Sequence, residues 1–151
     1  MIGTLAMTVL IFLSTECPVS NRYAPEIARL HGEFAPRGVT FRLVYPNPLD
    51  DDMAIKKHVV EFGYPPIAER DSNHALVKQT GATITPEAIV LDGRQRVVYR
   101  GRIDDRFVEL GRERPTATTR DLRNAITAAL AGRRVSPSRT QAVGCFIADM
   151  K

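Results

Sequence analysis

The feature that most constrains the fold is a continuous apolar run that stops just before a cysteine. The run covers residues 5–13, and Cys17 and Pro18 follow it closely. Apolar residues without alternation are typical of a strand that is buried on both faces of a parallel or mixed sheet. We therefore expect the first strand of an α/β domain to end shortly before Cys17.

A helix is predicted to start just after Cys17. Apolar residues recur at helical spacing between Ile27 and Phe34, which predicts a helix to about Ala35 with a kink at Pro25. The unpaired N–H groups and the dipole of a helix N-terminus favour an anion by roughly 0.3–1 kcal/mol. This predicts a modestly lowered pKa and a nucleophilic thiolate at Cys17, and the adjacent Glu16 opposes the effect.

The remaining sequence predicts alternating strands and helices. Strands are expected at 39–45, 67–69, 84–91 and 95–100, the last two joined by a tight turn at Asp92-Gly93. Helices are expected around 55–62, after an acidic cap at 50–52, at 73–79, and around 122–130, capped by Thr118 or Thr119. This order predicts a three-layer α/β/α domain with a central mixed sheet.

Size and composition are those of one domain with an ordinary surface. The chain has 151 residues, 44% of them hydrophobic, and a net charge of +4. No basic stripe with interleaved aromatic residues is present, so we do not expect nucleic-acid binding. Residues 1–13 have no basic start and are too short to span a membrane, so they are interpreted as a strand, not a leader. The compartment, cytoplasmic or extracytoplasmic, is not assigned.

The two cysteines, Cys17 and Cys145, are far apart in the sequence and lack zinc-ligand spacing. They are a reactive thiol with its resolving partner, a structural disulfide, or two unrelated thiols. We expect residues 1–132 to form the domain and residues 133–151 to form a tail that carries Cys145. No metal or cofactor is expected, and His31 and His58 are predicted to lie on the surface among charged neighbours.

Pro86 lies inside a segment that otherwise resembles a central strand. Proline cannot donate to a strand ladder, so this position calls for a special backbone geometry. A cis bond before proline costs only about 0.5–1 kcal/mol. We expect a cis Thr85-Pro86 bond that exposes the Thr85 backbone for pairing with an extended substrate next to Cys17.

Together these features resemble the thioredoxin-like fold in its redoxin branch, the alkyl hydroperoxide reductase and thiol-specific antioxidant type. Cys17-Pro18-Val19-Ser20 follows a buried strand where thioredoxins carry Cys-x-x-Cys, with Ser20 in place of the second cysteine. Pro25 has the spacing of that fold's kinking proline, and Thr85-Pro86 stands where the fold places a cis-proline. A hairpin followed by Gly101 and a closing helix completes the likeness over residues 5–132.

The preferred hypothesis is a thiol–disulfide oxidoreductase in which the Cys17 thiolate attacks a protein or small-molecule disulfide. Pro18, Ser20, Thr85 and Pro86 are predicted to form the binding surface around it. Ser20 cannot resolve the mixed disulfide, because it has a hydroxyl in place of a thiol. Resolution must therefore come from Cys145 or from an external thiol reductant.

Two alternatives stay open. A peroxidase resembles this chain in having a hydroxyl three residues before the cysteine, at Ser14, and would use Arg100 or Arg102 to stabilise the thiolate. Peroxiredoxins have a proline seven residues before the cysteine, where this chain has Leu10.

The other alternative is a non-enzymatic copper chaperone that resembles Sco proteins. It would need a second cysteine where this chain has Asn21, and His74 or Cys145 would have to supply the missing ligand.

Overall fold

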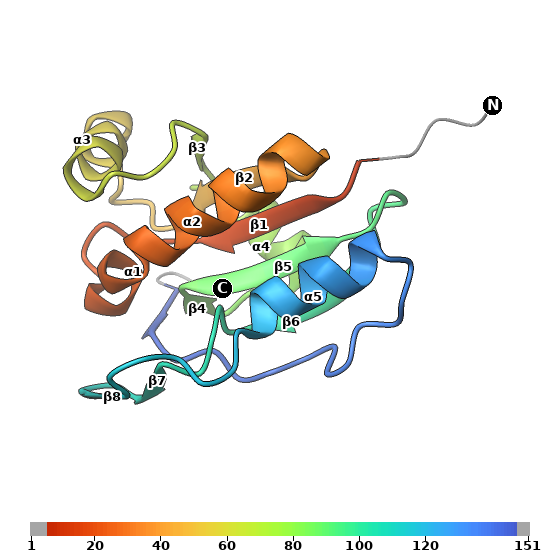
Figure 1. Ribbon diagram of the computed structural model, residues 1–151. Coiled ribbons are helices and arrows are strands. Elements are labelled where there is room, and N and C mark those ends of the chain that lie inside the picture. Colours follow the sequence, from red (N-terminus) through yellow and green to blue (C-terminus); the bar gives the residue numbers. More distant parts are fainter. Residues whose placement is uncertain (1–5, 148–151) are drawn as a thin grey trace.

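The computed structural model describes residues 6–147, so residue 5 of the predicted first strand lies outside the described part. A five-stranded sheet runs through the centre of the molecule (Figure 1). Its order is β3 (Ala68–Arg70), β2 (Thr40–Tyr45), β1 (Thr8–Phe12), β5 (Glu87–Leu91) and β6 (Val97–Gly101). β1 is central, parallel to β2 and antiparallel to β5. The predicted mixed sheet is confirmed.

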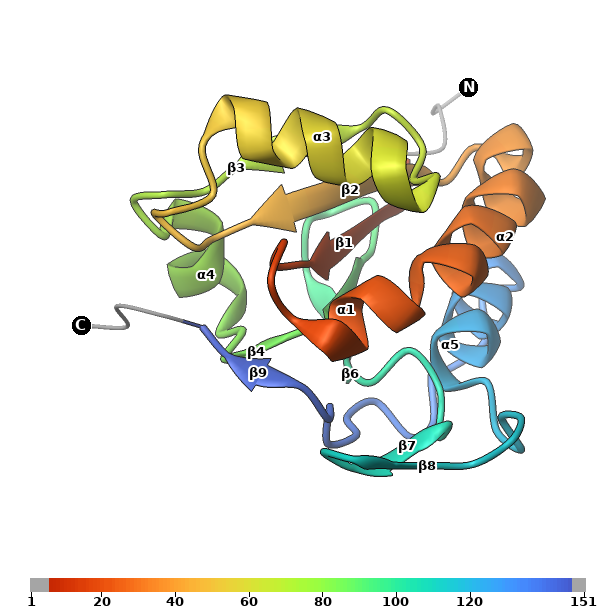
Figure 2. The same cartoon turned by 90° about the vertical axis from the view of Figure 1, so that its left-hand side faces the viewer.

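Helices cover both faces of this sheet, in three layers (Figure 2). Val9 and Ile11 belong to a core cluster that includes buried residues of α2 (Ala24–Phe34) and α5 (Asp121–Leu130). The alternate residues Leu10 and Phe12 belong to a second cluster with Val77 of α4 (Ala75–Thr80). The side-chain period of two along β1 therefore divides its apolar residues between the two layers.

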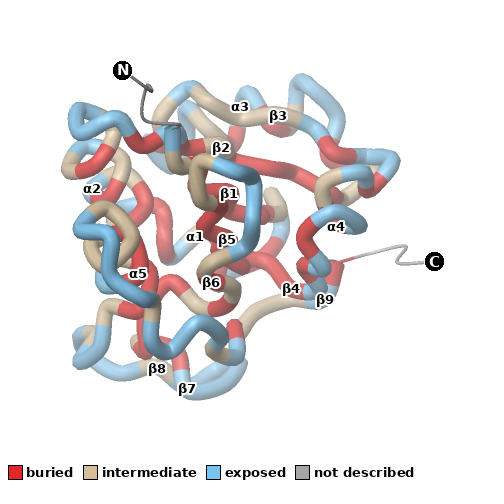
Figure 3. Tube along the Cα trace, turned by 90° about the vertical axis from the view of Figure 1, so that its right-hand side faces the viewer, coloured by how far each residue is buried: buried red, intermediate tan, exposed pale blue. Residues whose placement is uncertain are grey.

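Burial is greatest along the central strands, while the β7–β8 hairpin (Phe107–Glu109 and Arg112–Glu113) is largely exposed (Figure 3). Every residue of β1 is buried, and Val9 to Leu13 are fully inaccessible. Burying each large apolar side chain contributes about 1.5–3 kcal/mol. The strand that leads to Cys17 is thus the most firmly packed part of the chain.

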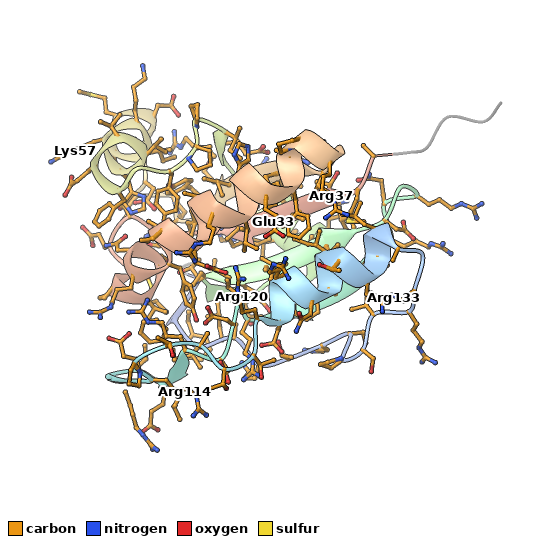
Figure 4. The ribbon with its side chains drawn as sticks, viewed as in Figure 1. Glu33, Arg37, Lys57, Arg114, Arg120 and Arg133 are labelled. Atoms are coloured by element: carbon orange, nitrogen blue, oxygen red, sulfur yellow. The ribbon has the colours of Figure 1, made fainter. Side chains whose placement is uncertain are left out.

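Ion pairs join the two helices on one face of the sheet. Arg120 lies 2.6 Å from Glu26, and Arg123 lies 2.6 Å from Glu33. Figure 4 shows Glu33 on α2 and Arg120 at the start of α5, where the two helices run side by side. The arginine side chains are 36% and 37% exposed, so each pair contributes at most about 1 kcal/mol.

The predicted kinked helix after Cys17 is two helices instead. α1 spans Pro18–Arg22, and α2 begins at Ala24. Pro25 lies in the first turn of α2, where a helix leaves N–H groups unpaired, so the proline starts a helix and does not bend one.

Two other expected elements differ in detail. The predicted strand 84–91 divides at Pro86 into β4 (Ile84–Thr85) and β5. Thr118 or Thr119 was the expected cap of the last helix. Their backbone N–H groups donate to Asp105 instead, and α5 begins after Arg120. The Asp51 cap of α3 (Asp52–Phe62) is confirmed, since its carboxylate accepts from the Ala54 N–H.

Candidate active site

Cys17 is the N-cap of α1, at the end of the loop that follows β1, and is 2% exposed. Its sulfur is 3.2 Å from the carbonyl oxygen of Thr85 and 2.6 Å from the sulfur of Cys145. Both cysteines are free, and their sulfurs are farther apart than the disulfide bond length of about 2.04 Å. The structure therefore brings together two thiols that are 128 residues apart in the chain.

A short ladder places Cys145 there. The Thr85-Pro86 peptide bond is cis, and Pro86 is buried. β4 pairs antiparallel with β9 (Cys145–Phe146), with Thr85 opposite Cys145 and Ile84 opposite Phe146. Figure 2 shows β9 beside β4, at the end of the sheet where α1 begins.

The tail is attached on both sides of Cys145. The Thr140 hydroxyl accepts from the Arg102 N–H at 3.0 Å and lies 2.6 Å from the hydroxyl of Tyr99. Beyond Cys145, the N–H of Ile147 donates to the Thr83 carbonyl at 2.9 Å, and its side chain is 6% exposed. Cys145 is thus held in a fixed segment, although β9 itself is only two residues long.

The surroundings of the two sulfurs favour a thiolate at Cys17. Burial opposes ionisation, but hydrogen bonds from the Cys145 thiol, from the Ser20 backbone N–H and from Thr85 together hold the pKa of Cys17 below its ordinary value. Burial, the hydrogen bond to Cys17 and the negative charge of Cys17 raise the pKa of Cys145 to about 12. Of the two thiols, Cys17 is therefore the more acidic and Cys145 the less acidic.

The lowered pKa of Cys17 has part of the predicted cause. A backbone N–H of the helix N-terminus, that of Ser20, contributes as expected, and hydrogen bonds from Cys145 and Thr85 add to it. The Ser20 hydroxyl is fully buried and has no hydrogen-bond partner within the described part of the chain. It is therefore free to turn toward the sulfur. Pro18, in contrast, is exposed at the rim of the site.

A buried polar network that the sequence did not reveal supports the Cys17 loop. The backbone N–H and the hydroxyl of Thr15 donate to the Asp50 carboxylate at 3.2 and 2.5 Å. His58 lies 2.6 Å from Asn21 through Nε2 and 2.8 Å from the Tyr45 hydroxyl through Nδ1. These bonds fix both ends of the Cys17 loop to α3 and to the segment before it.

His58 is therefore a correction, because it was predicted to be on the surface and is 3% exposed. Burial lowers the pKa of His58. His58 lies one helical turn after Ile55, the other buried residue of α3. This helical spacing was the signal in the sequence that could have predicted its burial. Asp50 was expected to belong to the acidic cap of α3, but its carboxylate binds Thr15 in the Cys17 loop instead.

Arg100, Arg102 and His74, which were singled out for the two alternative chemistries, are engaged elsewhere. Arg100 pairs with Glu87 at 3.0 Å, and Arg102 pairs with Asp121 at 2.7 Å. His74 is buried, and its Nε2 lies 2.8 Å from the Pro46 carbonyl oxygen. Over residues 6–147, no cluster of three or more histidine, cysteine or acidic residues could hold a metal ion.

The part of the chain that the structure describes also contains no helix long and apolar enough to cross a bilayer.

Comparison with known proteins supports the fold. The sequence matches no protein-family model and no curated protein. An uncharacterised conserved protein from Geobacillus kaustophilus is 31% identical and has a TM-score of 0.83, covering 95% of this chain and 77% of the other. A hypothetical protein from Sinorhizobium meliloti 1021 is 27% identical with a TM-score of 0.81, covering 93% and 78%.

A more distant structure carries a described activity. A secreted disulfide oxidoreductase from Mycobacterium tuberculosis is 17% identical with a TM-score of 0.56, covering 83% of this chain and 81% of its own. At this identity the likeness concerns the fold alone. It confirms the predicted three-layer, thioredoxin-like architecture with a central mixed sheet.

Proposed function

We propose that this chain, which belongs to the thioredoxin-like redoxin family, is a thiol–disulfide oxidoreductase that uses Cys17 as its nucleophile and Cys145 as its resolving thiol. The observation that carries the proposal is the 2.6 Å separation of the two sulfurs next to the Thr85 carbonyl. A lowered pKa at one thiol and a raised pKa at the other give the two groups unlike roles.

The first step is an attack on a substrate disulfide. The Cys17 thiolate forms a bond to one sulfur of the substrate, the substrate S–S bond breaks, and the other sulfur leaves as a thiolate that takes a proton from solvent. Cys17 is then a neutral mixed disulfide. Ser20 and Thr85 lie at the sulfur where this step occurs, and in this proposal Pro18 and Pro86 complete the binding surface.

The second step follows from the change of charge. Two of the three causes that raise the pKa of Cys145 are its hydrogen bond to Cys17 and the negative charge of Cys17. The mixed disulfide removes that charge, so Cys145 ionises more readily once Cys17 has reacted. The Cys145 thiolate attacks the Cys17 sulfur, the substrate leaves as its second thiol, and a Cys17–Cys145 disulfide remains.

The balance of the two steps is one substrate disulfide reduced to two thiols and one pair of protein thiols oxidised to a disulfide. An external dithiol must return two electrons to complete the cycle. In this proposal residues 1–132 supply the nucleophile and its surface, and residues 133–151 act as a resolving tail.

The two alternatives have less support from the geometry. A peroxidase would use an arginine beside the thiolate, and both Arg100 and Arg102 form ion pairs with other carboxylates. A copper chaperone would use His74, whose Nε2 lies against the Pro46 carbonyl, or Cys145, which does lie at Cys17. Copper titration of the full chain therefore tests the second alternative.

The test is a dithiothreitol-driven reduction of a small aromatic disulfide by the full chain. We expect catalysis above the uncatalysed rate, and its complete loss in Cys17→Ser, with unchanged folding by circular dichroism. Hydrogen peroxide replaces the disulfide in a parallel assay. Equal disulfide turnover by the variant would contradict the proposal, as would peroxide reduction that greatly exceeds disulfide reduction.

A further inference from the structure

The strand that carries Cys145 covers the place where a substrate would have to bind. Cys17 is 2% exposed, and Cys145 is the group that lies against its sulfur. A substrate sulfur must come to bonding distance from the Cys17 sulfur in order to react. It can do so only if Cys145 moves, so the substrate and β9 compete for the same position.

The backbone around this position determines what kind of substrate can take the place of β9. β4 pairs with β9 alone, in a two-stranded sheet separate from the central one. When β9 leaves, the backbone of Ile84 and Thr85 becomes an open strand edge. An edge of this kind takes up another extended chain by main-chain hydrogen bonds.

Gly144 shows which residue fits before the cysteine on such a chain. A Cβ atom at Gly144 would collide with the carbonyl oxygen of Thr85 and lie 2.8 Å from its carbonyl carbon. These are backbone atoms next to the cis Thr85-Pro86 bond and cannot move aside as a flexible side chain does. Any chain that reproduces this pairing needs glycine immediately before its cysteine.

The residues after the cysteine have unlike surroundings. Phe146 is 83% exposed, so the position directly after the cysteine places no demand on its side chain. Ile147 is 6% exposed and belongs to the apolar cluster that contains Leu10, Phe12 and Val77. The second position after the cysteine therefore requires an apolar side chain.

From these contacts we propose that β9 is a tethered stand-in for the substrate, and that the substrates of this site are extended peptide segments with the pattern glycine, cysteine, any residue, apolar residue. The inference rests on the proposed thiol–disulfide exchange at Cys17 and specifies its substrate class. The peptide pairs with β4 in the place of β9, with its cysteine sulfur in the place of the Cys145 sulfur.

The redox steps are those of the proposed reaction. The peptide cysteine is in a disulfide with a second peptide, the Cys17 thiolate takes the peptide sulfur, and the second peptide leaves as a thiol. The backbone of the bound peptide then detaches from β4 while its sulfur stays bonded to Cys17, and β9 pairs with β4 again. Cys145 attacks the Cys17 sulfur, and the first peptide leaves as a thiol. Two electrons pass from the protein thiols to the peptides, and dithiothreitol restores the reduced chain.

The experiment uses the full chain and disulfide-linked dimers of the capped peptide Ala-Val-Gly-Cys-Phe-Ile. Two comparison peptides replace the glycine by alanine or the isoleucine by aspartate. We expect kcat/KM to fall at least about tenfold for the alanine peptide and by a similar factor for the aspartate peptide. Reduction of each dimer by dithiothreitol alone gives the intrinsic reactivity of its disulfide.

A second measurement removes the resolving step. In Cys145→Ser, the mixed disulfide between Cys17 and the peptide accumulates and is counted by mass spectrometry. The glycine peptide should be trapped at least about tenfold faster than the alanine peptide. Equal rates for the two peptides, with a small aromatic disulfide still reduced, would overturn the substrate assignment and leave the proposed function standing. If the chain reduced neither the peptides nor the small disulfide, both the substrate assignment and the proposed function would be overturned.

Discussion

The two cysteines meet at one site but are held in very different ways. Cys17 follows a strand whose residues from Val9 to Leu13 are fully buried, at the centre of the sheet. Cys145 belongs to a two-residue strand that pairs only with β4, next to Phe146, which is 83% exposed. The nucleophile is thus placed by the core, and its partner by a short edge ladder.

This difference separates two requirements of the reaction. The attacking sulfur needs a fixed environment, and the hydrogen bonds from Ser20 and Thr85 that help to lower its pKa stay in place when β9 and the Cys145 thiol move away. The resolving sulfur must leave and return, and a short strand has few bonds to break. Attachment at Thr140, which lies before β9, limits how far it travels.

The largest effect is expected from substitution of Cys145, because it removes the resolving thiol and keeps the attacking one. In Cys145→Ser the attack by Cys17 remains and the resolution is lost, so a mixed disulfide should accumulate on Cys17. Turnover with dithiothreitol should fall to the rate at which the external thiol resolves that species. Intact-mass measurement after acid quenching detects it. An undiminished rate without any adduct would show that Cys145 takes no part.

The next effect concerns the approach of the tail to β4. Gly144→Ala places a methyl group against the Thr85 carbonyl, so β9 should detach and formation of the Cys17–Cys145 disulfide should slow about tenfold or more. Gly32→Ala is the matched control, because nothing lies within 4 Å of its added Cβ. Thiol counting after a pulse of a small disulfide measures the rate. Similar rates in both variants would contradict the role of the close approach.

A smaller effect is expected at the attachment of the tail. Thr140→Val removes the acceptor of the Arg102 N–H, at a cost of about 1–3 kcal/mol. Thr127→Val, which removes a hydroxyl bonded only to the Arg123 carbonyl, is the control on α5. Urea unfolding gives the free energy of unfolding of each. If Thr127→Val lost as much unfolding free energy as Thr140→Val, the loss would not be due to the attachment of the tail.

The smallest effect is on the pH profile of alkylation. The thiolate is the reactive form, so the rate at Cys17 rises with pH through its pKa and levels off above it. Because that pKa is lowered, the rise should be complete at a lower pH than for a free thiol. Ser20→Ala removes a buried hydroxyl donor and should move the profile upward. Iodoacetamide labelling with peptide mapping measures it, and an unmoved profile would contradict the role of Ser20.

The sequence predicted the central mixed sheet and the cis bond before Pro86. An uninterrupted apolar run such as that of β1 indicates a buried strand. A proline inside a strand pattern, as at position 86, indicates a special backbone geometry because proline cannot donate to a strand ladder. The position of Cys145 was left open among three interpretations. Its ladder with β4 has two residues, and a segment that short has no periodicity to detect.

The polar residues under the loop were missed for a related reason. Asn21 belongs to α1, His58 to α3 and Asp50 to the loop before α3, and the tertiary packing of these segments brings them to the Cys17 loop. Local sequence rules assigned His58 to the surface because its neighbours are charged. Side chains that support a site from outside its motif are determined by the tertiary fold, which single-sequence patterns do not contain.

The most direct test of the account is to treat the fully reduced chain with one equivalent of a small disulfide and map the products. We predict the loss of both protein thiols and an intramolecular bond between Cys17 and Cys145, found in digests as one linked pair of peptides. A chain that retains a free Cys145 beside a persistent adduct on Cys17 would contradict the central claim.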